Sequence, residues 1–209
     1  MVALCEETSS VRGSGESVET KLRSIAEKAR REPGFKFTSL YHLMNVELLR
    51  GCFKRLRKDA AAGIDEMTKD MYAEHLEANL IDLVDRLQRM AYIPQPVRRK
   101  YIPKPGSAKQ RPLGIPCFED KLVQAGLVQI LNAVYEQDFI DDSYGFRPKR
   151  SCHDALRALS MTVETKPINH IVEADIKGFF DNVNQEWLMK FLAHRIGGQE
   201  DSADGKTFP

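Results

Sequence analysis

The chain has 209 residues, 42% of them hydrophobic and 29% charged, which is ordinary for one soluble globular domain with a core of its own. The net charge of +1 does not by itself predict a nucleic-acid partner, and no apolar run approaches the roughly 20 residues that span a bilayer, so we expect no membrane partner. The four cysteines lie far apart, which favours reduced thiols in a cytoplasmic protein over a zinc site or a disulfide framework.

The first 36 residues differ in composition from the rest of the chain. Residues 1–36 are rich in Ser, Gly, Glu and Arg, and they predict a flexible N-terminal arm. A short helix from Val18 to Arg30 is expected within it, and Pro33-Gly34 ends that helix.

Two amphipathic helices are expected next. Thr38 or Ser39 is placed to cap a helix whose apolar residues recur at helical spacing as far as Leu56. The Gly-Ile-Asp sequence that ends at Asp65 breaks this pattern. Asp65 is interpreted as a turn or capping carboxylate, with a functional contact as the alternative. Thr68 then caps a second helix that runs to about residue 87.

A β-hairpin comes after the helices. Residues 101–116 predict two short strands around a turn rich in Pro, Gly and Ser. Lys104 and Arg111 stand at the two ends of this turn, so both cationic groups are placed to reach one triphosphate. The arginine offers a bidentate fork and the lysine a point charge, and both suit phosphate oxygens.

Positive charge concentrates in and before the hairpin. Between Arg86 and Arg111 the chain has eight basic residues and no acidic one. Such a block predicts a surface that follows a phosphate backbone, and a solvated basic face is the alternative. Three consecutive cations in the block are candidate RNA-binding residues: Arg98, Arg99 and Lys100.

Rings and cations alternate in residues 142–154, between two expected helices. Residues 119–136 predict a buried helix, and Ser151 and Asp154 have the spacing of a capping box for a helix to about residue 163. Interleaved aromatic and cationic side chains suit single-stranded nucleic acid. The candidates are Tyr144, Phe146 and Arg147, and core packing of the two rings is the alternative.

Residues 171–183 combine a carboxylate with an aromatic ring. Alternating apolar residues predict a short strand from Ile171 to Ile176 that delivers Asp175. A carboxylate on a rigid strand suits a hard cation such as Mg²⁺, and the ring of Phe180 suits the sugar side of a nucleotide pocket. A turn or cap role for Asp175 is the plainer alternative. Asn184 is expected to cap the next helix.

Five segments, in this order, resemble the bacterial group II intron reverse transcriptase/maturase family: residues 62–65, 102–116, 135–139, 143–148 and 173–182. The resemblance extends from about Phe37 to Ile196. It implies an α+β fold in residues 37–196, consisting of the fingers and part of the palm of a right-hand polymerase. This fold is rich in helices, with a β-hairpin and a first palm strand.

The resemblance also implies a chemistry. It predicts an RNA-directed DNA polymerase that acts in intron splicing and mobility, with two Mg²⁺ ions, intron or template RNA, a DNA primer and deoxynucleoside triphosphates. Asp175 would bridge the ions, assisted by the backbone carbonyl of Ile176. Further implied roles are a triphosphate clamp of Lys104 and Arg111, with Lys109 as a substitute, a sugar contact for Phe180, and a template pocket lined by Tyr144, Phe146 and Arg147.

The sequence departs from the family pattern after Trp187. The family's Pro-Gln-Gly turn and Tyr-Ala-Asp-Asp hairpin, which supply further metal ligands, are not found there, and residues 197–209 read as a divergent tail. We therefore expect the front part of a reverse transcriptase that is inactive alone, and a homodimer or a complementing fragment stays open. Two alternatives are an RNA-binding module that grips intron RNA without catalysis and an inert relic of a mobile element.

Overall fold

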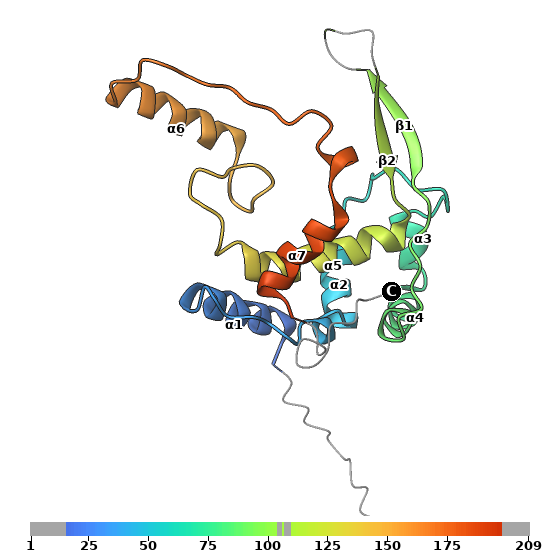
Figure 1. Ribbon diagram of the computed structural model, residues 1–209. Coiled ribbons are helices and arrows are strands. Elements are labelled where there is room, and N and C mark those ends of the chain that lie inside the picture. The colour runs from blue at the N-terminus through green and yellow to red at the C-terminus, as the bar shows by residue number, and fades with distance from the viewer. Residues whose placement is uncertain (1–15, 104–105, 107–109, 198–209) are drawn as a thin grey trace, which may run out of the picture.

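The computed structural model describes residues 16–103, 106 and 110–197. These residues form a helix-rich chain with one two-stranded antiparallel sheet, as the sequence predicts (Figure 1). The elements in chain order are α1 (Val18–Arg31), η1 (Tyr41–Leu43), α2 (Val46–Arg55), α3 (Lys69–Ala73), α4 (Leu76–Gln88), β1 (Arg98–Pro103), β2 (Gln110–Ile115), α5 (Phe118–Tyr135), α6 (Cys152–Thr165), η2 (Phe180–Asn182) and α7 (Gln185–Arg195).

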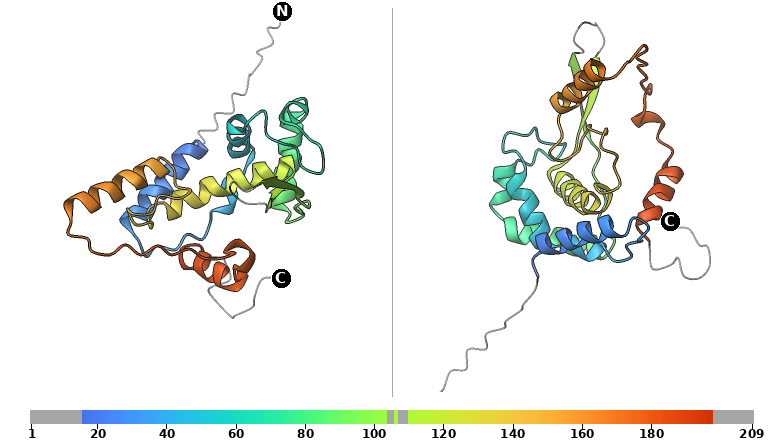
Figure 2. Two further views of the ribbon diagram at one scale, coloured as in Figure 1. Left: turned by 90° about the horizontal axis from the view of Figure 1, so that it is seen from above. Right: turned by 90° about the vertical axis from the view of Figure 1, so that its left-hand side faces the viewer.

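Helix α5 is the centre of the core. Helices α1 and α2 pack against it, and α2 also packs against α4 (Figures 1 and 2). Leu49, Leu83 and Leu122 are fully buried where these helices meet, and each such side chain contributes about 1.5–3 kcal/mol of burial free energy. The rings of Tyr72 and Phe118 lie 4.8 Å apart and extend this core to α3.

The described part of the expected N-terminal arm belongs to the packed body. Helix α1 confirms the helix predicted from Val18, with Ser17 as its N-cap. Val18 and Ala29 are buried, and α1 packs on α5, so the packing has no boundary at residue 36. The physical reason is the apolar stripe of α1, where Leu22 and Ile25 pack against the buried core.

Two predicted helices are interrupted. The helix expected from Thr38 or Ser39 begins at Val46, because the side chain of Asn45 accepts a hydrogen bond from the Leu48 amide and so caps the helix there. Thr68 does cap a helix, α3, but α3 ends at Ala73 and α4 begins at Leu76. In both places apolar periodicity predicted the buried face but not the break.

The later helices and the hairpin agree with prediction. Helix α5 covers the expected buried helix, and α7 begins after Asn184, whose side chain accepts a hydrogen bond from the Trp187 amide. Ser151 and Asp154 form a complete capping box at the start of α6. The hairpin strands pair antiparallel from Arg98 with Ile115 to Pro103 with Gln110.

The expected strand from Ile171 to Ile176 is not present. Residues 167–176 have neither helix nor strand, and their side chains are exposed. A strand needs a neighbour for its backbone hydrogen bonds, and the described residues form one sheet, which consists of β1 and β2 alone. The prediction of a first palm strand was therefore wrong for the structure of this chain.

Among the described residues, no helix combines the length and the apolar character that crossing a bilayer requires.

Candidate nucleic-acid interface

The hairpin sorts its charged residues onto two faces. Directly paired residues of an antiparallel ladder lie on the same face, and successive residues alternate. Arg98 pairs with Ile115, Lys100 with Leu113, and Ile102 with Arg111, so one face carries all six of these side chains. Arg99 lies on the opposite face, where its partner is Gly114. The three consecutive cations Arg98, Arg99 and Lys100, which were predicted as one group, thus lie on two opposite faces of the hairpin.

The face with Arg98, Lys100 and Arg111, here called the cationic face, is open to solvent except at Ile115, which is buried. All three cations are exposed, and none of them has an ion pair with another described residue. The apolar side chains of Ile102 and Leu113 are also exposed between them. The predicted partners Lys104 and Lys109 lie outside the described residues. Charge on both edge strands also opposes edge-to-edge pairing with another chain.

Arg147 organises the loop that comes after α5. Its side chain is 7% exposed and forms an ion pair with Glu136 at 2.9 Å. It also donates to the carbonyl oxygens of Ile140, at 2.7 Å, and Ser143, at 2.9 Å. These contacts occupy the guanidinium within its own loop. The structure therefore gives Arg147 a supporting position rather than one open to a template strand.

The same loop presents two rings. Phe146 is fully exposed, and its backbone has a φ of 57°, in the left-handed region that a bulky residue seldom adopts. Tyr144 is half-buried, and the guanidinium of Arg150 lies 5.5 Å from its ring centroid. Core packing, the alternative interpretation of both rings, does not hold for Phe146.

Asp175, Ile176 and Phe180 lie in the stretch between α6 and α7. Asp175 and Ile176 are exposed on residues without regular structure. Phe180 begins η2 and is also exposed, with its ring 5.4 Å from that of Phe179 in an edge-to-face arrangement. The side-chain amide of Asn182 donates to the carbonyl oxygen of Gly178 at 2.7 Å, which closes the turn before η2.

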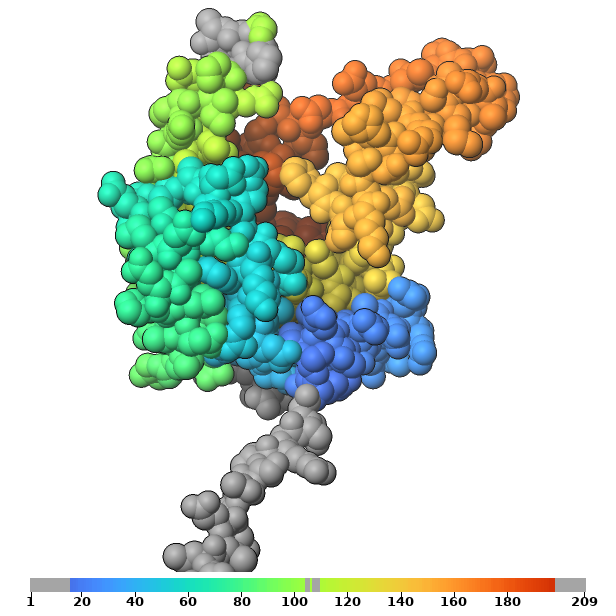
Figure 3. Space-filling model, turned by 180° about the vertical axis from the view of Figure 1, so that it is seen from behind, coloured from blue at the N-terminus to red at the C-terminus, as the bar shows by residue number. Residues whose placement is uncertain are grey.

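The structure does not gather the predicted residues into one pocket. In Figure 3 the hairpin flanks one side of a hollow and residues around α6 flank the other, while the red C-terminal stretch is seen at the back. Two cavities, of about 260 Å³ and 420 Å³, lie elsewhere, and none of the predicted site residues lines either of them.

The donor set does not fit a two-metal site. Two Mg²⁺ ions need several carboxylate oxygens on rigid elements. Within the described ranges, no group of three or more His, Cys, Asp or Glu side chains is arranged to hold a metal ion. Asp175 alone, on an irregular stretch, cannot supply the ligands that two ions require.

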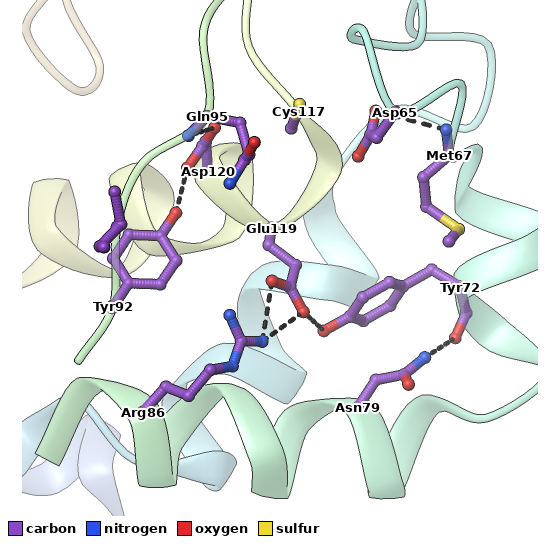
Figure 4. Close-up of a pocket in the computed structure, with 11 residues that line it drawn as sticks. Asp65, Met67, Tyr72, Asn79, Arg86, Tyr92, Gln95, Cys117, Glu119 and Asp120 are labelled. Atoms are coloured by element: carbon purple, nitrogen blue, oxygen red, sulfur yellow. Dashed lines mark hydrogen bonds and ion pairs between the residues drawn. The ribbon is translucent and has the colours of Figure 1, made fainter. Parts of the chain in front are cut away.

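The smaller cavity reveals polar residues that the sequence pattern did not single out. It lies at the start of α5, near the base of the hairpin, and its lining includes Tyr92, Gln95, Glu119 and Asp120 (Figure 4). Glu119 and Asp120 occupy the first turn of α5, which was interpreted only as a buried helix. The sequence signal that could have singled out these residues was an acidic pair at the start of a predicted helix, where acidic side chains are stabilised.

The structure confirms the interpretation of Asp65 as a turn or capping carboxylate. One carboxylate oxygen accepts from the Met67 amide and the other from the Phe118 amide, each at 3.3 Å. Asp65 therefore fixes its own turn and also caps the N-terminus of α5 from 53 residues away.

Comparisons with known proteins decide the family. Residues 102–200 match the family model described as reverse transcriptase (RNA-dependent DNA polymerase). The chain is 36% identical over 176 residues, 84% of its length, to the group II intron-encoded protein LtrA of Lactococcus lactis subsp. cremoris. It is 39% identical over 138 residues, 64% of its length, to protein YkfC of Escherichia coli K12. The chain belongs to the group II intron reverse transcriptase family.

A fungal protein is also similar to the chain. The chain is 33% identical over 196 residues, 90% of its length, to an uncharacterized 91 kDa protein in the cob intron of Schizosaccharomyces pombe. The chain spans 29% of LtrA, 36% of YkfC and 23% of the fungal protein. The region matched by the reverse transcriptase model includes β2, α5 and the end of β1, so it takes in much of the hairpin that carries the cationic face.

Proposed function

We propose that this chain binds RNA, together with a DNA primer and deoxynucleoside triphosphates, as the fingers and part of the palm of a group II intron reverse transcriptase. Intron splicing and mobility are the processes in which it would act. The observation that carries the proposal is the cationic face, where Arg98, Lys100 and Arg111 are exposed and form no ion pair with other described residues. Three cations on one rigid ladder suit the regular spacing of phosphates.

The remaining candidate residues take supporting roles in this proposal. Arg111, with Lys104, would hold the triphosphate, and Phe180 would contact its sugar. Tyr144 and Phe146 would stack on bases of the template, because an exposed ring offers a sequence-tolerant stacking surface. Arg147 would hold the loop that presents these rings. Asp175 and the Ile176 carbonyl would contribute to metal binding only with further carboxylates from outside the described residues.

Salt-dependent RNA binding tests the proposal. Affinity for a single-stranded RNA is measured by fluorescence anisotropy over a range of salt concentrations. Replacing Arg98, Lys100 and Arg111 together by Gln should lower the affinity and reduce the slope of log K against log salt by about 2, since each phosphate contact in a single strand contributes about 0.7.

A charge-matched control uses helix α1. Lys21, Arg23 and Arg31 lie there, away from the hairpin, and replacing all three by Gln removes the same charge. This control should keep most of the affinity and slope. Equal losses in the two triple variants would show that binding follows net charge rather than the cationic face, and would contradict the proposal.

Primer extension separates binding from catalysis. The described residues supply no cluster of carboxylates for two metal ions, so the chain alone should bind an RNA template but incorporate no deoxynucleotide. RNA binding by the same preparation serves as the control for folding. Incorporation that Asp175→Asn abolishes and Asp181→Asn retains would contradict the expected inactivity, and would assign Asp175 to a working site.

A further inference from the structure

The two ends of the hairpin reach α5 by different routes. Strand β2 ends at Ile115 and continues through two residues into α5, so that end is attached covalently. Strand β1 is preceded by residues 92–97, here called the strap, which lead from the end of α4. The strap returns to α5 through hydrogen bonds to a single side chain, Asp120 (Figure 4).

Asp120 is a buried carboxylate that holds the strap at two points. It is 5% exposed. One of its oxygens accepts a hydrogen bond from the Tyr92 hydroxyl, and the other accepts one from the backbone amide of Gln95 at 3.2 Å. Without this buried acceptor, both donors of the strap would lose their partner on α5.

The neighbouring carboxylate has a different task. Both oxygens of Glu119 lie 2.9 Å from the same Arg86 nitrogen of α4, and the Tyr72 hydroxyl of α3 lies 3.5 Å away. Glu119 therefore holds α3 and α4, whereas Asp120 holds the strap. Of these two adjacent acids in one helical turn, Glu119 thus serves the packing of the helices, and Asp120 serves the attachment of the hairpin.

The chemistry of the Asp120 contacts suits a fixed anchor. A carboxylate in the first turn of a helix is stabilised by the helix dipole, and hydrogen bonds to a charged acceptor are stronger than neutral ones. Burial, and then the bond to Asp120, raises the pKa of Tyr92 above its ordinary value, so the hydroxyl keeps its proton at neutral pH. The Tyr92 hydroxyl therefore stays a donor to Asp120 across the neutral range, and the two hydrogen bonds join α5 to the strap at Tyr92 and at Gln95.

We propose that Asp120 is a positioning residue that fixes the orientation of the hairpin on α5, and with it the direction in which Arg98, Lys100 and Arg111 face a nucleic-acid strand. This inference rests on the proposed function and adds to it the residue that orients the cationic face. A face held in one orientation binds more tightly, because binding need not then order it.

Three variants test the inference. Asp120→Ala removes both strap contacts, and Tyr92→Phe removes one of them from the strap side, which guards against loss of the fold in the first variant. Glu119→Gln is the matched control, since it alters the adjacent acid and leaves the strap contacts in place. Hydrogen exchange reports the protection of the strap and β1, and anisotropy reports RNA affinity and its salt slope.

The expected results separate anchoring from general stability. Asp120→Ala should speed exchange at the Gln95 amide and in β1 and weaken RNA binding on the order of tenfold, with Tyr92→Phe intermediate. Glu119→Gln should lower the melting temperature while leaving exchange in β1 and the RNA affinity near wild type.

Four outcomes overturn the inference or the proposed function in distinguishable ways. Unchanged exchange at Gln95 in Asp120→Ala would overturn the anchor. Faster exchange with unchanged RNA affinity, or equal RNA losses in the Asp120 and Glu119 variants, would overturn the positioning role. Wild-type RNA binding by the triple variant of the cationic face would instead overturn the proposed function, and exchange would still decide whether Asp120 anchors the hairpin.

Discussion

The guanidinium of Arg195 lies 3.0 Å from the carboxylate of Asp138, and the arginine is 2% exposed. This ion pair joins the end of α7 to the loop after α5. The same guanidinium donates to the carbonyl oxygens of Ala29, Glu32 and Pro33 at the end of α1. One buried side chain therefore connects three parts of the chain that are far apart in sequence.

The Arg195 contacts predict a large loss of stability on truncation. Arg195→Ala should cost about 3–5 kcal/mol, because it leaves Asp138 without its partner in a partly buried site and leaves the last carbonyls of α1 without a donor. Thermal or urea unfolding measures the change. Arg195→Lys is the control: it keeps the charge and loses the fork, so it should lose less. A truncation that changes stability by no more than a surface substitution would contradict this prediction.

Gly63 predicts a second sensitive position. A Cβ at Gly63 would lie 2.7 Å from the Cα of Cys117 and 2.9 Å from the carbonyl oxygen of Pro116, so a side chain there must move backbone. Gly63→Ala should destabilise the fold by about 1–3 kcal/mol. Gly145→Ala is the matched control, because a Cβ there meets no atom within 4 Å. Equal melting temperatures for the two variants would be evidence against the close approach.

The capping box of α6 predicts a pH dependence at its start. The hydrogen bond from the Ser151 hydroxyl, at 2.6 Å, is the largest cause that lowers the pKa of Asp154 below its usual 3.8. A carboxyl with a lowered folded pKa contributes stability that is present above its unfolded pKa and is lost as pH falls through the folded value. The start of α6 should therefore fray in acid, below about pH 4. NMR shifts of the Ser151 amide measure this, and Asp154→Asn should remove the transition.

Sequence pattern predicted local structure well where one residue decides it. Ser151, Asn184 and Thr68 were each recognised as caps because a capping side chain accepts a hydrogen bond from a backbone amide only three residues along the chain. Asn45 was missed as a cap because the apolar period continues across it. Tertiary bonds gave no such local signal: the contact of Asp65 with Phe118 and that of Arg195 with α1 join residues far apart in sequence.

The candidate site was predicted in part for the same reason. Successive side chains of a strand point to opposite faces, so the sequence of β1 already implied that Arg99 lies apart from Arg98 and Lys100. Grouping the three residues by charge alone overlooked this. The strand expected to carry Asp175 failed because alternation cannot supply the neighbouring strand that it needs. Arg147 looked like a template-binding residue by its residue type and its place among rings, and only the fold revealed its contact with Glu136.

Ultraviolet crosslinking tests the central claim most directly, because it reports where the RNA lies. A single-stranded RNA with 4-thiouridine is crosslinked to the protein, and modified peptides are mapped by mass spectrometry. We predict crosslinks in the peptides that cover β1 and β2, and their loss in the triple variant of the cationic face. Crosslinks confined to α1, α3 or α4, with unmodified hairpin peptides, would contradict RNA binding by the cationic face.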